Sequence, residues 1–332
     1  MKKCVPILPM ALLICLLAPP ILAQTRDNAA GSDEARKLNG QAVASYKEGK
    51  YEEAIKLQKQ ALAMWEKELG KEHKLIATGS TNLGEMYMAL NRYDEAVGAY
   101  QRALKIEEKL LGPEHPDLVV LMIKLGWMHY GNANVKEAEA LFKRAVAIRE
   151  KQGADDVGVA EPLFSLAAFY QKIRQPAAAV PIYQRVIAVQ EKHFGPEGKP
   201  LVETLEQCAC ALAQDKKMTE ASEMTRRAAL IEGKTTQGFV VSREGVLTGE
   251  AIHKVQPPYP PEAKYKRISG SVSVKIEIDE SGIVTDAKII CGGGILAEVS
   301  REAALQWLFK PSILNGQAVK VRGILTFNFT LK

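Results

Sequence analysis

The hydrophobic and polar positions of this chain follow two different periods. Through the middle of the chain, as in residues 75–111, apolar residues recur every three to four positions, which is the spacing of amphipathic helices. From about residue 246 the pattern changes, and residues 271–279 alternate strictly between apolar and polar side chains. Strict alternation is typical of a half-buried strand. We therefore expect a helical part followed by a part that contains a sheet.

The helical part is an internal repeat. Four connectors contain Gly70, Gly112, Gly153 and Gly195, which are spaced by 42, 41 and 42 residues. Each connector lies between amphipathic helices, and small side chains recur where the two helices of a pair must approach closely. Glycine, alone or followed by proline, is expected to end the second helix of each pair. The pattern predicts about five helix pairs over residues 34–231, stacked into a superhelix.

The C-terminal part is expected to be a small α+β domain with a three-stranded antiparallel sheet. Residues 271–279 and 283–291 are predicted to be two strands joined by a turn that contains glycine. Residues 298–309 have the spacing of a helix. An Asn-Gly pair, typical of hairpin turns, then precedes the alternating residues 319–332, which are predicted to form the last strand. Its expected inward residues are Val321, Leu325, Phe327, Phe329 and Leu331.

The repeat resembles the tetratricopeptide repeat, in the 42-residue form found in kinesin light chains. The segment ALKIEEKLLGPEHPDLVVLMIKLGWMHY, residues 103–130, carries the resemblance through its Gly-Pro-x-His-Pro-Asp connector. In that family the first helix of each pair lines a concave face, and here Ile123, Trp127 and Phe164 together would form an apolar groove suited to a peptide with bulky side chains. The resemblance implies a face lined by Thr78, Thr81, Glu85, Val120, Ile123, Trp127, Tyr130, Glu161, Phe164 and Gln171. Trp127 has a second interpretation, as a core side chain between helices.

The C-terminal part resembles the TonB carboxy-terminal domain over residues 247–332. The resemblance rests on the Gln-Pro-x-Tyr-Pro signature at 256–260 and on the Trp-x-Phe-x-Pro run at 307–311. In that family the domain binds a short segment of an outer-membrane transporter by strand addition, and residues 323–330 are the candidate edge here. The partner contacts this implies are Gln256, Pro257, Tyr259, Pro260, Arg322, Ile324, Thr326, Asn328 and Thr330. A plain linker, with Tyr259 tucked against the domain, is the competing interpretation of the proline-rich segment.

The first 23 residues are expected to be a secretory signal peptide. Lys2 and Lys3 precede an apolar run without charges that ends at Ala23. An uncleaved membrane anchor is the alternative. Prolines within this run argue against it, because they shorten any continuous helix below the roughly 20 residues that a bilayer needs. The expected order is a signal peptide at 1–23, disordered residues at 24–33, repeats at 34–231, a linker at 232–246 and the TonB-like domain at 247–332.

The net charge does not favour nucleic acid as a partner. The formal charge of +5 includes Lys2 and Lys3, so a chain cut after the signal carries 5 − 2 = +3. This value is close to neutral, and no basic run with interleaved aromatic residues accompanies it.

No motif for catalysis, metal binding or a cofactor is evident. Cys208, Cys210 and Cys291 would remain in the mature chain, and their spacing favours buried free thiols over a redox or metal pair. Cys208 and Cys210 are two apart on a predicted helix and should not bond to each other. His73 and His115 occupy equivalent connector positions, where we expect loop capping and not metal binding. A phosphate loop, a nucleophile elbow and an H-E-x-x-H motif are all missing from the sequence.

These observations predict a protein-interaction protein of the periplasm or cell envelope of a Gram-negative-type bacterium, not an enzyme. The repeats would hold one unknown protein or peptide, and the TonB-like domain would bind a TonB-dependent outer-membrane transporter. One alternative is an energy transducer that keeps residues 5–23 as a membrane anchor, and only then is membrane contact expected. A further alternative is a regulatory or substrate-holding subunit of an envelope enzyme.

Overall fold

The structure is a computed structural model that describes residues 33–235, 239–241, 251–314 and 316–331. The expected signal segment and most of the expected linker lie outside the described residues. The chain divides into two compact units, whose described parts begin at residue 33 and at Leu166.

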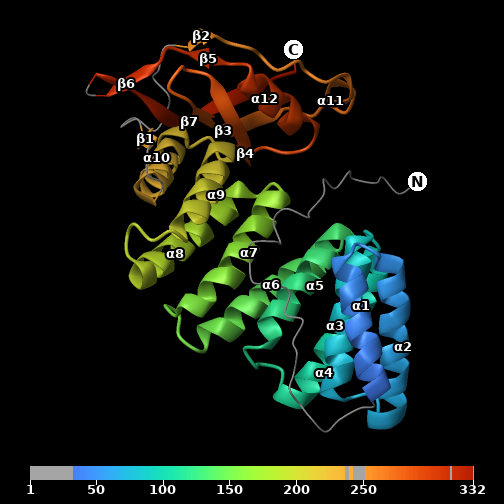
Figure 1. The fold of residues 1–332 in the computed structure, drawn as a ribbon. Coiled ribbons are helices and arrows are strands. Elements are labelled where there is room, and N and C mark those ends of the chain that lie inside the picture. Colours follow the sequence, from blue (N-terminus) through green and yellow to red (C-terminus); the bar gives the residue numbers. More distant parts are fainter. Residues whose placement is uncertain (1–32, 236–238, 242–250, 315, 332) are drawn as a thin grey trace. The chain divides into compact units, whose positions relative to one another are not determined.

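The helices follow one another in five successive pairs, as the repeat predicts (Figure 1). The pairs are α1 (Asp33–Lys47) and α2 (Tyr51–Leu69), α3 (Lys74–Ala89) and α4 (Tyr93–Leu111), α5 (Leu118–Gly131) and α6 (Val135–Glu150), α7 (Ala160–Lys172) and α8 (Pro176–Phe194), and α9 (Leu201–Gln214) and α10 (Met218–Thr235). A short 3-10 turn, η2 (Val157–Val159), precedes α7. The predicted helical repeat is therefore confirmed.

Glycine on a first helix lets the aromatic ring of the second helix approach closely. A Cβ added at Gly84 of α3 would come within 2.7 Å of the Tyr100 ring of α4. One repeat later, a Cβ at Gly126 would meet the Phe142 ring at 3.0 Å. Both rings are fully buried. The repeat thus carries a packing rule, in which a missing side chain on one helix makes room for a ring on the next.

Glycines end three of the second helices, as expected. Gly70, Gly112 and Gly195 follow α2, α4 and α8 with φ of +80°, +92° and +78°. Each amide donates a hydrogen bond to the carbonyl four residues earlier, which closes the last turn. The third connector differs, because the C-cap after α6 is Lys151 and Gly153 comes two residues later.

The C-terminal part has the predicted α+β fold around three long antiparallel strands in the order β7-β3-β4. These strands are β3 (Gly270–Ile278), β4 (Val284–Cys291) and β7 (Gln317–Phe329). Shorter strands are β1 (Phe239–Val241), parallel to β7; β6 (Ser312–Leu314), antiparallel to β7; and β2 (Ala251–His253), paired with β5 (Leu308–Phe309). Helix α12 (Ile295–Leu305) packs on β3 and β4, and α11 (Pro261–Tyr265) contacts α12 (Figure 1).

The core of this domain lies on the α12 face of the sheet. Every second residue of β3 is buried there, namely Val272, Val274, Ile276 and Ile278. Four of the five residues expected inward on the last strand are also buried, namely Val321, Leu325, Phe327 and Phe329. The prediction for Leu331 was wrong. That side chain is 40% exposed, because β7 ends at Phe329 and the alternation no longer fixes its direction.

Candidate partner-binding surfaces

Strand β7 has an open edge along its second half. On one side it pairs with β3 over residues 321–329. On the other side β6 pairs with residues 317–319 and β1 pairs with residues 320–322. No described strand pairs with that side of residues 323–329, which we call the open edge. Its outward backbone N–H and C=O groups are a template for another strand.

The predicted partner residues of the open edge lie on the sheet face opposite the core. Ile324 is half-buried, whereas Thr326, Asn328 and Thr330 are exposed. The hydroxyl groups of Thr326 and Ser273 lie 3.2 Å apart across β7 and β3. Because these side chains point away from the sheet plane, contact along the edge itself is left to the backbone.

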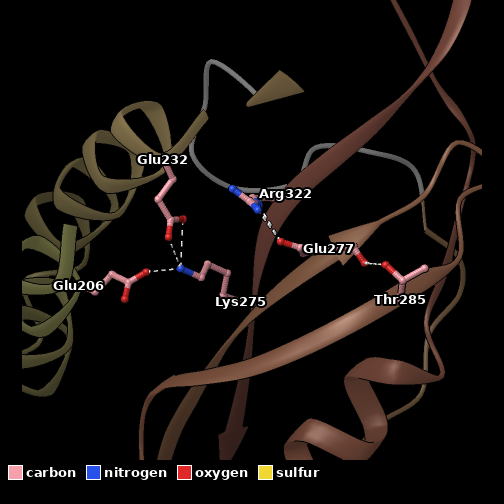
Figure 2. Close-up of polar contacts among 6 residues, drawn as sticks. All are labelled: Glu206, Glu232, Lys275, Glu277, Thr285 and Arg322. Atoms are coloured by element: carbon pink, nitrogen blue, oxygen red, sulfur yellow. Dashed lines mark hydrogen bonds and ion pairs between the residues drawn. The ribbon is translucent and has the colours of Figure 1, made fainter. Parts of the chain in front are cut away.

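Arg322 is engaged within its own sheet. Its Nε donates a hydrogen bond of 2.8 Å to Oε1 of Glu277 on β3 (Figure 2). The Arg322 side chain is only 13% exposed. We therefore assign Arg322 to the polar face of the sheet, where it neutralises a neighbouring carboxylate.

The proline-rich segment 256–260 is fastened to the end of β7. The Tyr259 hydroxyl donates a hydrogen bond of 2.6 Å to the carbonyl of Ile268. The Tyr259 ring packs edge-on against Phe329, with ring centroids 5.5 Å apart. Tyr259 therefore packs within the domain. A shallow hollow beside this contact is lined by Ser269, Gly270, Asn328, Phe329, Thr330 and Leu331.

A second anchor holds the start of the same segment. Nε1 of Trp307 donates a hydrogen bond of 2.7 Å to the carbonyl of Val255. Pro257 and Pro260 are half-buried, and Gln256 between Val255 and Pro257 is exposed. Of the four signature side chains, Gln256 is thus the most exposed.

The residues predicted for the concave face of the repeats lie on α3, α5 and α7. Those that are half-buried are Thr78, Thr81, Glu85, Val120, Trp127, Tyr130, Phe164 and Gln171, whereas Glu161 is exposed. Ile123 is 8% exposed and belongs to the core. Glu85 accepts a hydrogen bond from Nζ of Lys124, and this ion pair joins α3 to α5.

Two of these side chains make specific contacts inside the repeats. The Trp127 ring packs edge-on against Phe142, with centroids 5.0 Å apart, and against Tyr130 at 5.9 Å. The Gln171 side chain lies 2.8 Å from the sulfur of Cys210 and accepts a hydrogen bond of 3.1 Å from Tyr183. The Trp127 ring is thus packed against neighbouring rings and is also partly exposed. Both interpretations, a core side chain and a residue of the concave face, agree with this geometry.

A ladder of ion pairs, which the hydrophobic pattern does not reveal, joins successive second helices. The pairs are Glu66–Arg102 at 2.6 Å, Glu108–Arg144 at 2.6 Å, and Glu191–Arg227. The acid and the base recur together at the repeat distance, so the period of charged residues was the signal that could have found the ladder. These pairs are partly exposed, and each contributes at most about 1 kcal/mol.

Cys210 and Cys291 form a disulfide bond, with Cα atoms 5.2 Å apart. The expectation of free thiols was therefore wrong for these two residues. It failed because they are 81 residues apart, on α9 and at the end of β4, so no local spacing connects them. Cys208 is free and buried, as expected. Its burial raises the pKa of the Cys208 thiol to about 11.

Both connector histidines accept a hydrogen bond from a backbone amide two residues later, as expected for capping residues, and His73 is the N-cap of α3. Nδ1 of His73 accepts a hydrogen bond of 3.2 Å from the amide of Leu75, and Nδ1 of His115 accepts one of 3.2 Å from the amide of Asp117. Within the described ranges, His, Cys, Asp and Glu side chains form no group that could hold a metal ion. In the same ranges no helix combines the length and apolar character needed to cross a bilayer.

Comparisons with known protein families match both parts of the chain. Two models described as "Tetratricopeptide repeat" match, one at residues 33–106 and 75–151 and the other at residues 165–198. The model described as "Gram-negative bacterial TonB protein C-terminal" matches residues 255–331. Protein TonB of Vibrio cholerae is 28% identical over 116 residues, which cover 34% of this chain. The match spans 46% of the length of that curated relative.

Solved structures resemble the helical part. The nearly identical TPR-like repeats of a kinesin light chain candidate from Podosopora anserina superpose with a TM-score of 0.55 and 27% identity, covering 61% of this chain and 96% of that one. BtubC (BKLC) from P. vanneervenii shares the fold, with a TM-score of 0.53 and 21% identity over 60% of this chain and 80% of that one. The chain therefore combines tetratricopeptide repeats with a following domain that matches the TonB C-terminal model.

Proposed function

We propose that this protein is an exported protein-interaction protein of the cell envelope, without catalytic activity. Its TonB-type domain binds an extended segment of an outer-membrane transporter by strand addition, and its repeats bind a second protein or peptide. The observation that carries the proposal is the open edge of β7 in a domain of this family. Backbone groups at such an edge recruit a strand with little dependence on side chains.

The other long edge of the sheet is less suited to a partner. Strand β4 pairs with β3 on one side and contacts helix α9. Its last residue, Cys291, is bonded to Cys210 of α9. The helix therefore lies near the end of that edge, and the open edge of β7 is the better site for an added strand.

Backbone methylation of the partner tests strand addition directly. The probe is a synthetic peptide from a short segment of a TonB-dependent transporter, titrated calorimetrically into the full mature chain. In an added strand, alternate amides point to the sheet and the others to solvent. N-methyl groups on one alternate set should abolish binding, whereas N-methyl groups on the other set should leave the affinity within about twofold of the parent peptide.

Two variants of the protein test whether the peptide binds at the open edge of β7. Thr326→Ala should leave peptide affinity nearly unchanged, because Thr326 is exposed and its side chain lies off the edge. Thr326→Pro distorts the strand and should weaken binding at least tenfold, with a circular dichroism melt to show that the chain still folds. If the folded proline variant binds as tightly as the parent chain, β7 is not the site. The segment around Gln256 then becomes the next candidate.

A second candidate function is energy transduction for TonB-dependent transport, and the similarity to Protein TonB over 116 residues favours it. A transducer must stay in the inner membrane, so it would keep residues 5–23 as an anchor. Mass spectrometry of the amino terminus of the protein from cells separates the two functions. A mature chain that begins at Gln24 supports the exported adaptor, whereas an intact amino-terminal segment supports the transducer.

A further inference from the structure

The polar face of the C-terminal sheet meets the last helix pair of the repeats (Figure 2). Lys275 of β3 points from this face toward the helices. Its Nζ lies 2.6 Å from Oε1 of Glu206 on α9 and 2.9 Å from Oε1 of Glu232 on α10. The three side chains are 15%, 11% and 24% exposed, so they are largely shielded from water. One lysine thus joins a strand to two helices.

The charges of this cluster suit a specific contact. Burial disfavours the charged form of Lys275, but the carboxylates of Glu206 and Glu232 outweigh it and raise the pKa of Lys275. The ammonium group of Lys275 is attracted to both carboxylates. Removing it would leave the negative charges of Glu206 and Glu232 close together, where little water can screen them. A surface without the matching charges would leave these groups unpaired, so the contact strongly favours this sheet face over other surfaces.

A covalent link reinforces the ionic one. The disulfide joins Cys210 of α9 to Cys291 at the end of β4, the strand next to β3. Helix α9 also contacts β4 directly. The covalent and ionic contacts therefore fall on the same helix and on neighbouring strands of one sheet.

We propose that helices α9 and α10 form a docking surface for this chain's own C-terminal domain, held by the Cys210–Cys291 disulfide and by Lys275 between Glu206 and Glu232. The proposal does not depend on where a transporter binds.

The disulfide needs an oxidant. The thiols of Cys210 and Cys291 lose two electrons and two protons, which a thiol–disulfide oxidoreductase in its disulfide form takes up as its own two thiols. A reduced dithiol reverses the exchange and releases the covalent link. Disulfides of this kind persist in oxidising compartments such as the bacterial periplasm, in agreement with an exported protein.

Cutting the chain between helix α10 and the C-terminal domain tests the covalent link. A specific protease site is placed within residues 236–238 of the full chain, so that β1 stays with the C-terminal piece that it pairs with. The protein purified from the periplasm is then cut to completion. We expect one band on a denaturing gel without reductant and two bands with reductant. Cys208→Ser, the matched control on the same helix, should give the same result. Cys291→Ser should give two bands in both gels.

The ionic contact is tested on the same cut protein after reduction. Under native conditions, the two pieces should elute together from a size-exclusion column, because the helix and strand faces still fit. Lys275→Met should abolish co-elution, and so should the double variant Glu206→Gln, Glu232→Gln, which leaves the sheet unchanged. Lys254→Met, an exposed lysine of the same domain, is the control that should retain co-elution.

Two results would overturn the proposal. Two bands from the unmutated cut protein without reductant would show that Cys210 and Cys291 are not bonded. Separate elution of the unmutated reduced pieces would show that α9 and α10 are not a docking surface. Circular dichroism of each variant confirms folding, and the two helix-side substitutions keep the test valid if Lys275→Met fails to fold. Peptide binding at the open edge is not part of either readout.

Discussion

We expect His129 of α5 to make the repeats sensitive to mild acid. Its side chain is 8% exposed, and the amide groups of Gln101 and Asn134 each lie 3.4 Å from a ring nitrogen. Burial lowers the pKa of His129, although the charge of Glu137 opposes the shift. The unfolded chain therefore binds the proton more readily than the folded chain. We expect stability to fall as the pH drops below about 6.5, by at most about 1.4 kcal/mol per pH unit.

Thermal melts of the full chain between about pH 5 and pH 8 measure this dependence. The variant His129→Gln cannot take up a proton there, so its melting temperature should change less over the same range. His193→Gln, at an exposed position, is the matched control and should keep the parent dependence. Equal slopes for the parent chain and His129→Gln would show that His129 does not carry the effect.

Residue roles could be predicted from sequence where the partner is close along the chain. His73 was expected to cap because it recurs in a connector, and it accepts from the amide of Leu75 only two residues away. The partner of Cys210 could not be predicted in this way. Cys291 lies 81 residues further on, and only the folded sheet brings it to α9. The ion pairs of Lys275 could not be predicted from the sequence either, because its carboxylate partners lie on helices of the repeats.

At the scale of elements, the fit between paired helices depends on glycine. A Cβ at Gly84 would meet three atoms of the rigid Tyr100 ring within 3.0 Å. In Gly84→Ala the cost of overpacking, about 1–3 kcal/mol, should exceed the helix-propensity gain of roughly 1 kcal/mol. Gly98 on the partner helix α4 is exposed, and a Cβ added there would have nothing within 4 Å. Gly98→Ala should therefore stabilise the repeats.

Chemical denaturation of the two alanine variants, followed by helical circular dichroism, compares them directly. The midpoint should fall for Gly84→Ala and rise for Gly98→Ala, although the chemical change is identical and both glycines are helical. If both midpoints rise, α3 and α4 do not approach each other as closely as the structure has them.

The long elements were predictable and the short ones were not. The five helix pairs and the alternating strands β3 and β7 each repeat a period over many residues, so chance patterns are excluded. Strands β1 and β6 have three residues each, too few for a period to be recognised. Both pair with β7, and together they limit the open edge to residues 323–329. The extent of the candidate site was therefore set by elements that the sequence pattern does not reveal.

At the scale of the whole molecule, the repeat pattern and the compact units have different limits. The pattern ends near residue 231, yet the unit that contains the C-terminal domain begins at Leu166. Within this unit, contacts between α9 and β4, the disulfide and the Lys275 ion pairs join the last helix pair to the sheet. The repeat period predicts which residues contact each other within a repeat. It gives no information on which helix faces the C-terminal domain covers.

The disulfide should control the stability of the second unit and leave the first unit unchanged. Cross-linking residues 81 apart removes conformational freedom from the unfolded chain, and a loop of this size corresponds to about 4 kcal/mol. Amides of β3, which open only on global unfolding of the sheet, should then exchange with deuterium about a thousandfold faster after reduction. Amides of α2 to α5 lie outside the loop and should exchange at the same rate in both states, which makes them an internal control.

Three variants assign the effect to the bond itself. Cys208→Ser retains the disulfide and should show the full response of β3 to reductant. The double variant Cys210→Ser, Cys291→Ser lacks the bond, so β3 should exchange quickly with or without reductant. Lys275→Met removes the ion pairs but not the bond, so it should exchange faster than the parent while still responding to reductant. Because the bond acts on the unfolded chain and the ion pairs on the folded one, a parent chain whose β3 exchange ignores reductant would mean that residues 210 and 291 are not linked in the protein in solution.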